Sequence, residues 1–267
     1  MITNNILLAI PPLSVKPDVI FTLFGIPITN SILGMMLVNL FILLLIFAIR
    51  KNMSIVPSKI QTLFELPFVW FKETVYNSIK DEKKAKKFFP MFFSLFVLFL
   101  VANQLSVVPM IMDITANQGG NIVNLFKVPT SDFSLPIALA LFIIILFNIM
   151  ALAISPLKHI GSFIKIVPVF KARSFAELAN ALLELFLGLL DIISEIAKVV
   201  SLSARLFGNV FAGELMIIII TYIASFTNFI IPIPFIVLSI FSGLVQALVF
   251  PLLTVQYMAG TLANVEE

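Results

Sequence analysis

Residues 175–230 begin FAELANALLELFLGLLDIISEIAKVVSLSARLFGNVFAGEL and contain no proline. The stretch is predominantly apolar, yet it contains seven charged residues: Glu177, Glu184, Asp191, Glu195, Lys198, Arg205 and Glu214. As a single helix its 56 residues would be about 84 Å long, far more than a bilayer is thick. We therefore expect a membrane helix that is either steeply tilted or broken.

The composition of the whole chain supports the membrane class. Of its 267 residues, 60% are hydrophobic and 12% are charged, and the mean hydropathy is +1.12. Four or five spans with their loops use up this length, so we expect a single membrane domain, 1–267. Within it we distinguish an outer N-terminal segment (1–30), three spans with their loops (31–174) and a charged helical hairpin (175–267).

Three further segments are uncharged and long enough to cross a bilayer: residues 31–49, 88–112 and 133–155. In the segment 57–79 charged residues interrupt the apolar ones, which predicts an amphipathic helix at the membrane interface. Pro232 and Pro234 mark a turn before a last apolar helix at 235–263. The fold class is therefore all-α and polytopic, with about five membrane helices, the last two forming a long tilted hairpin.

Lysine and arginine are concentrated in two loops, at 50–87 and 158–173, whereas the N-terminal stretch and the 113–132 loop have very few. The two basic loops are expected to face the cytoplasm. We interpret the run KDEKKAKK at 80–87 as a solvated, topology-setting cluster rather than a lipid or partner site. His159, the only histidine, is expected to be a loop residue. Because the N-terminus lacks a basic region, no cleaved signal peptide is expected.

Most of the charged residues in 175–230 are spaced so that they share one face of a helix. On a helical wheel one face carries Glu184, Asp191, Glu195, Lys198, Arg205 and Asn209. A charge inside a membrane is costly, so such a stripe usually faces protein, water or a moving partner. For Lys198 a simpler explanation has equal weight: Asp191, Glu195 or both neutralise it along the helix.

Arg205 lacks such an explanation, because no acidic residue lies three or four positions away and no other predicted span contains one. We expect its counter-charge on another subunit. Since arginine stays protonated, it is suited to act as a fixed positive charge rather than as a proton carrier.

Polar residues continue elsewhere. Glu214 points about 180° away from Arg205 at 100° per residue, so it should face a different environment. One face of the last helix carries Ser239, Ser242, Gln246 and Tyr257. Asn209 and Gln246 can orient water, but each amide can also act only as an interhelical hydrogen bond.

Four segments resemble subunit a of F-type ATP synthases: SLSARLFGNVFAGEL at 201–215, QALVFPLLTVQYMA at 246–259, PTSDFSLPIALAL at 129–141 and FTLFGIPITNSIL at 21–33. The resemblance covers nearly the whole chain. It implies a stator subunit that holds two offset ion half-channels against a rotating ring of c subunits, each with one essential carboxylate. The implied partners are this ring, the peripheral-stalk b subunits and membrane lipid.

The resemblance also implies roles for individual residues. Arg205 matches the arginine between the half-channels. Asn209, Glu214, Gln246 and Ser239 match positions of the outer half-channel, Asp191 and Ser201 match positions toward the cytoplasmic exit, and Tyr257 matches a tyrosine near the end of the last helix. Where the family often has histidine or an acid, this chain has Ser239, so the outer relay is expected to use water and a hydroxyl.

Other functions are disfavoured. Without cysteine, phosphate loop, metal-ligand cluster or nucleophile arrangement, the chain is not expected to be an enzyme or to bind a cofactor, metal, nucleic acid or soluble substrate. The alternative function is a self-contained ion channel or secondary transporter, and a third is a scaffold. The expected ion is the proton, with sodium left open. The expected location is a bacterial plasma (inner) membrane, with the mitochondrial inner membrane as the alternative.

Overall fold

The structure is a computed structural model that describes residues 17–51, 53–54, 57–79, 81–107, 115–118, 121–156, 161, 175–223 and 230–266. Its helices in this part of the chain are α2 (Asn30–Lys51), α3 (Lys59–Ser78), α4 (Glu82–Ser106), α6 (Ser134–Ile154), α9 (Phe175–Ile223) and α10 (Pro232–Glu266). Four of them, α2, α4, α6 and α10, are long and apolar enough to cross a membrane. The prediction of a helical, polytopic membrane protein is confirmed. The second basic loop apart from residue 161, His159 included, and the end of the predicted span 88–112 lie outside the described residues.

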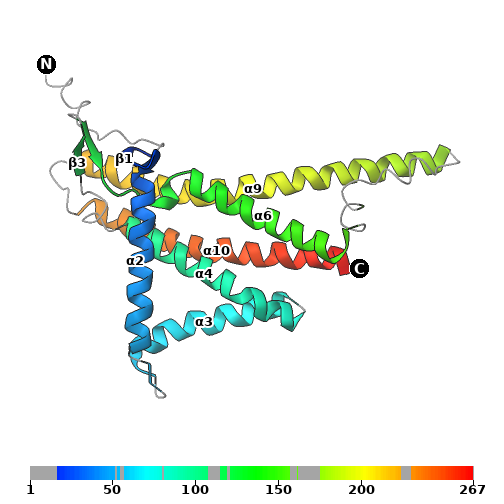
Figure 1. The fold of residues 1–267 in the computed structure, drawn as a ribbon, viewed down its shortest axis with the longest axis horizontal. Coiled ribbons are helices and arrows are strands. Elements are labelled where there is room, and N and C mark those ends of the chain that lie inside the picture. The colour runs from blue at the N-terminus through cyan, green and yellow to red at the C-terminus, as the bar shows by residue number, and fades with distance from the viewer. Residues whose placement is uncertain are drawn as a thin grey trace.

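Helix α9 is continuous over its 49 residues, a length of about 74 Å. Figure 1 shows its N-terminal end extending past the neighbouring helices, with α10 running antiparallel beside it. Helix α2 runs across the direction of α9 and α10 in the same view. Of the two sequence alternatives, the break is therefore excluded for 175–223. If the axis of α2 lies close to the bilayer normal, the axis of α9 must be strongly tilted away from that normal.

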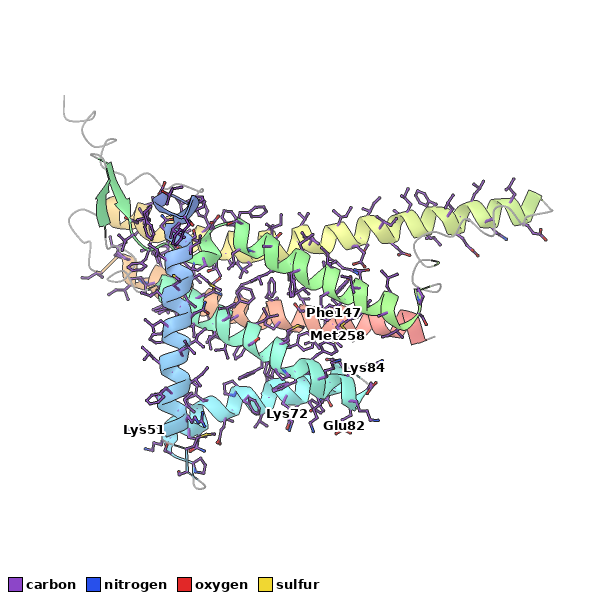
Figure 2. All side chains as sticks on the ribbon, in the orientation of Figure 1. Lys51, Lys72, Glu82, Lys84, Phe147 and Met258 are labelled. Atoms are coloured by element: carbon purple, nitrogen blue, oxygen red, sulfur yellow. The ribbon has the colours of Figure 1, made fainter. Side chains whose placement is uncertain are left out.

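The core lies where α4, α6, α9 and α10 meet, and large aromatic side chains fill it. Phe92, Phe99, Phe147 and Phe250 are fully buried, and the ring centroids of Phe99 and Phe250 are 4.5 Å apart. Phe147 of α6 and Met258 of α10 lie close together in Figure 2 and belong to the same buried cluster. Lipid is as apolar as these side chains, so close packing rather than the hydrophobic effect holds the helices together.

The predicted helix at 57–79 is present as α3. Ser58 caps its N-terminus by accepting a hydrogen bond from the backbone N of Gln61 at 3.3 Å. Phe71 and Val75 are buried in the core cluster shared with α4. The side chains of Leu63, Leu66, Val69 and Trp70 are exposed, among others. This uncovered apolar side suits a helix lying in a membrane interface.

Helix α4 begins at Glu82, within the basic cluster, and Asp81 is its N-cap residue. The carboxylate of Asp81 accepts hydrogen bonds from the backbone N of Lys83 and Lys84, at 2.9 and 3.3 Å. The bond from Lys84 in particular holds the pKa of Asp81 below its usual range. Figure 2 shows Lys72, Glu82 and Lys84 near one another where α3 and α4 meet. The basic cluster thus lies where α3 ends and α4 begins.

Two short hairpins were not predicted: β1 (Val19–Leu23) with β2 (Ile26–Thr29), and β3 (Thr115–Gln118) with β4 (Asn121–Asn124). The first hairpin turns at Phe24 and Gly25, whose φ angles of 51° and 82° are both positive. Two consecutive positive φ angles are typical of a type I′ hairpin turn. Strands of four or five residues beside long spans give too weak an alternation to stand out in the sequence.

The loop after β4 lies directly against the start of α2. The backbone N of Lys127 donates to the carbonyl of Asn30 at 3.2 Å. A Cβ atom at Gly34 would lie 1.9 Å from the carbonyl oxygen of Lys127. Only glycine at this position lets the loop approach α2 so closely.

We predict that Gly34→Ala destabilises the protein by roughly 1–3 kcal/mol, because a backbone carbonyl cannot yield as a flexible side chain would. Thermal denaturation in mild detergent measures the change. The matched control is Gly260→Ala in α10, where a Cβ meets nothing within 4 Å. Equal stability of the two variants would contradict this account of the loop.

Candidate functional site

Arg205 lies on an exposed side of α9. Its neighbours Leu202 and Leu206 are buried against the rest of the protein. Within the described part of the chain, the guanidinium makes no hydrogen bond and no ion pair. Among the described residues Arg205 therefore has no counter-charge, and a partner on another subunit stays a prediction.

The other members of the polar stripe are placed similarly. Glu184, Asp191, Lys198 and Asn209 are exposed, whereas Glu195 is half-buried. Large apolar side chains surround the stripe on the exposed surface of α9, among them Leu183, Phe186, Leu190, Ile193 and Val200. Most of this face is left uncovered by the described residues.

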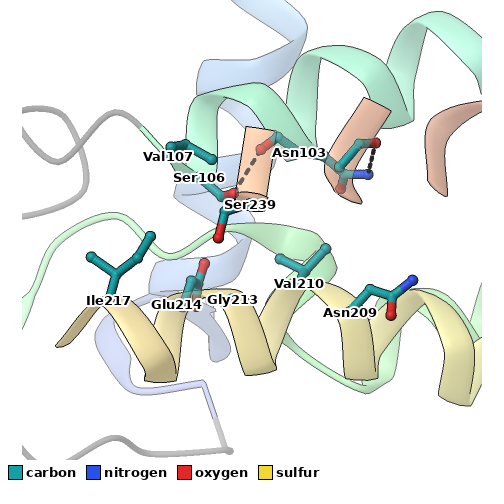
Figure 3. Close-up of a pocket in the computed structure, with 10 residues that line it drawn as sticks. Asn103, Ser106, Val107, Asn209, Val210, Gly213, Glu214, Ile217 and Ser239 are labelled. Atoms are coloured by element: carbon teal, nitrogen blue, oxygen red, sulfur yellow. Dashed lines mark hydrogen bonds between the residues drawn. The ribbon is translucent and has the colours of Figure 1, made fainter. Parts of the chain in front are cut away.

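A small cavity lies on a different side of α9, between α4, α9 and α10 (Figure 3). Its volume of about 20 Å³ is enough for a single water molecule. Its lining residues are Asn103, Ser106, Val107, Asn209, Val210, Gly213, Glu214, Ile217, Ser239 and Gly243. Figure 3 shows the side chains of Glu214 and Ser239 pointing toward one another across it.

The cavity walls are mainly apolar, but several polar groups reach them and the walls are closely spaced. Asn103 donates from Nδ2 to the carbonyl of Gly243 at 3.1 Å, but its buried Oδ1 has no hydrogen-bond partner among the described residues. A Cβ at Gly213 would lie 2.9 Å from Ser239 Oγ, so glycine brings the backbone of α9 close to this hydroxyl. A water molecule here would have polar partners on all three helices.

Asn209 and Gln246 form a direct link between α9 and α10. Asn209 Nδ2 donates to Gln246 Oε1 at 2.9 Å. Gln246 is buried, and its Nε2 has no hydrogen-bond partner in the described part of the protein. The predicted outer residues Asn209, Glu214, Ser239 and Gln246 are thus brought together by the structure.

The sequence patterns did not predict that Glu214 is accompanied by other polar side chains, which come from the loop before α6. The Glu214 carboxylate interacts with the Ser131 hydroxyl and with the charge of Lys127. Nearby, Ser31 Oγ donates to Asp132 Oδ2 at 3.0 Å, and Ser131 and Asp132 are both buried. Burial lowers the pKa of Lys127, opposed chiefly by the negative charge of Asp132.

The available signals were weak. The residues TSD at 130–132 belong to a segment that resembles the family, and the adjacent amides Asn103 and Gln104 stand out as polar in an otherwise apolar span. Neither pattern indicates which other helix these side chains meet.

The remaining predicted residues lie apart from the cavity. Asp191 and Ser201 are exposed on α9, and Asp191 is 23 residues, or about 34 Å, along the helix from Glu214. Tyr257 is half-buried, and its hydroxyl interacts with Asn148 and Glu195. Among the residues that the structure describes, no three His, Cys, Asp or Glu side chains are close enough to hold a metal ion.

Comparison with known proteins settles the family. The family model described as ATP synthase A chain matches residues 31–259. The chain belongs to this family. It is 30% identical over 249 residues to ATP synthase subunit a of Moorella thermoacetica, covering 92% of this chain and 96% of the relative.

Two other relatives extend the comparison. The sodium ion specific ATP synthase subunit a of Propionigenium modestum is 27% identical over 246 residues, 91% of this chain and 77% of the relative. ATP synthase subunit a of Mycobacterium ulcerans is 29% identical over 244 residues, 90% and 89% of the two chains. The chain is therefore a multi-pass membrane subunit of an ATP synthase, with a role in ion transport.

We predict that Gln246→Leu reduces ion transport by the assembled synthase by roughly tenfold, because it removes the amide that positions Asn209 at the edge of the cavity. The loss of stability should be small, since interhelical hydrogen bonds in membranes average about 0.6 kcal/mol. ATP-driven transport into inverted vesicles and thermal denaturation measure the two effects. Gln256→Leu, an exposed glutamine of the same helix, is the control. Unchanged transport would mean that the amides only hold the two helices together.

Proposed function

We propose that this chain moves protons through two offset half-channels along a rotating ring of c subunits and so couples a transmembrane gradient to ATP synthesis. The observation that carries the proposal is the position of Arg205. It is exposed on the long helix without an ion pair among the described residues, while Glu214 is directed to the other side of the same helix. A permanent cation in an apolar environment requires an anion from outside the chain.

The outer half-channel is proposed to lead through the small cavity. Glu214 is the carboxylate in its wall, and Ser239, Asn209 and Gln246 are polar groups that can orient water beside it. A cavity that holds one water can complete a relay between a carboxylate and a hydroxyl without a second titrating side chain.

The cytoplasmic half-channel is proposed to run along the exposed stripe. Asp191 and Ser201 lie on it, toward the N-terminal end of α9 from Arg205. An ion released by a ring carboxylate at Arg205 would leave past these groups. Arg205 lies between the two polar routes and would oppose direct passage of a cation from one to the other.

The partners follow from the surface that α9 leaves uncovered. Its exposed face combines large apolar side chains with the charged stripe, which suits a ring of apolar helices that each carry one carboxylate. We further propose that peripheral-stalk b subunits hold the chain in place as a stator. The proposed location is a bacterial plasma membrane. Nucleotide chemistry is assigned to other subunits.

We predict that Arg205→Ala lowers ATP-driven proton pumping by roughly 100-fold or more, because the ring carboxylate loses its electrostatic counterpart. Acidification of inverted vesicles containing the whole synthase measures pumping, and copurification of the c subunits measures assembly. Arg50→Ala removes an exposed arginine at the end of α2 and should leave pumping intact.

Coupled pumping by an assembled Arg205→Ala complex would refute the proposal. Ion conductance by the purified chain alone in liposomes would instead support a self-contained channel, the competing function.

The transported ion is tested separately, because one relative is named as sodium ion specific. We expect vesicle acidification to persist in buffers from which sodium has been removed. Loss of ATP-driven transport without sodium, and its return when sodium is added, would assign this chain to sodium transport while leaving the role of Arg205 unchanged.

A further inference from the structure

A second group of interacting side chains lies where α6, α9 and α10 meet, away from the small cavity. The Tyr257 hydroxyl of α10 donates a hydrogen bond to Glu195 Oε2 of α9. The same hydroxyl accepts a hydrogen bond from Asn148 Nδ2 of α6 at 2.9 Å. Lys198 Nζ lies 2.9 Å from Glu195 Oε1 and 4.6 Å from the centroid of the Tyr257 ring.

The polar groups of this cluster match one another closely. The hydroxyl of Tyr257 uses both its donor and its acceptor capacity, and each oxygen of Glu195 accepts one hydrogen bond. Lys198 combines an ion pair with a cation–π contact, although nearly half of its side chain is exposed. Three helices therefore fix a single lysine in one place.

The position of this lysine relative to Arg205 gives the cluster its significance. Seven residues separate the two, so Lys198 lies about 10.5 Å along α9 and on nearly the same face. Both are exposed, but within the described residues only Lys198 has an anionic partner. Without that partner, α9 would present two free cations to any carboxylate that passes along this face.

We propose that Glu195, held by Tyr257 and Asn148, neutralises Lys198 so that Arg205 is the single unpaired cation that a passing ring carboxylate meets. This inference rests on the proposed function, because it assumes a carboxylate moving along α9. Glu195 and Tyr257 are then positioning residues. They act by keeping Lys198 from competing with Arg205 for the same anion.

The variant Glu195→Gln tests the charge while preserving the size of the side chain and an oxygen that can accept from Tyr257. ATP-driven proton pumping per ATP hydrolysed, measured in inverted vesicles with the whole synthase, should fall by roughly three- to tenfold, because Lys198 then competes for the ring carboxylate. Adding Lys198→Gln removes the competitor. The double variant should return to within about twofold of the unmodified protein.

If Glu195 and Tyr257 only hold the helices together, the result is different. Proton pumping per ATP hydrolysed by the double variant would then be no better than that of Glu195→Gln alone. That outcome overturns the proposal, as does full coupling in the single variant. If the single variant fails to assemble, assembly and coupling of the double variant support the proposal, and failure of both overturns it. Glu73→Gln removes an exposed carboxylate from α3, outside the polar stripe of α9, and should leave coupling unchanged.

Two outcomes distinguish a failure of the proposed function from a failure of this inference alone. If assembled Arg205→Ala complexes remain coupled, the carboxylate does not depend on Arg205 and the basis of the inference is lost. If Arg205→Ala abolishes coupling while Glu195→Gln has no effect, only the role of Glu195 and Tyr257 is wrong.

Discussion

A side chain that stays charged inside a membrane needs an anion or water close to it, and the structure is organised around the way each charge meets this need. Lys198 meets it within the chain, through Glu195. The carboxyl group of Glu214 lies instead among polar partners, Ser131 and Lys127, beside a cavity of the size of one water molecule. Arg205 does not meet it among the described residues, which supports the proposal that its counter-charge lies on another subunit.

The helices are arranged so that these environments stay separate. One side of helix α9 carries polar groups to the cavity, and another side carries the exposed charges. The aromatic core of α4, α6 and α10 supports it from one side only. Close approaches at Gly213 and Gly34 bring polar groups of neighbouring elements together where larger residues would separate them.

Much of the architecture could be predicted because a bilayer restricts what a chain can do. Long uncharged runs gave α2, α4 and α6 within a few residues at most ends, and charged interruptions gave α3. The hairpins β1–β2 and β3–β4 were missed, because short strands outside the spans carry little periodic signal. In the site, helical periodicity separated Glu214 from Arg205, since that relation depends on a single helix.

The sequence by itself determined that the chain is a membrane protein, that Arg205 lacks a local counter-charge, and that residues 201–215 resemble one family. These features depend on composition, on spacing along one helix and on a local motif. Only the tertiary structure decided that Asn103 and Gly243 share a cavity with Glu214, that Asn209 bonds to Gln246, and that Tyr257 and Asn148 hold Glu195 beside Lys198. Contacts between helices depend on packing, which the periodicity of a single helix does not encode.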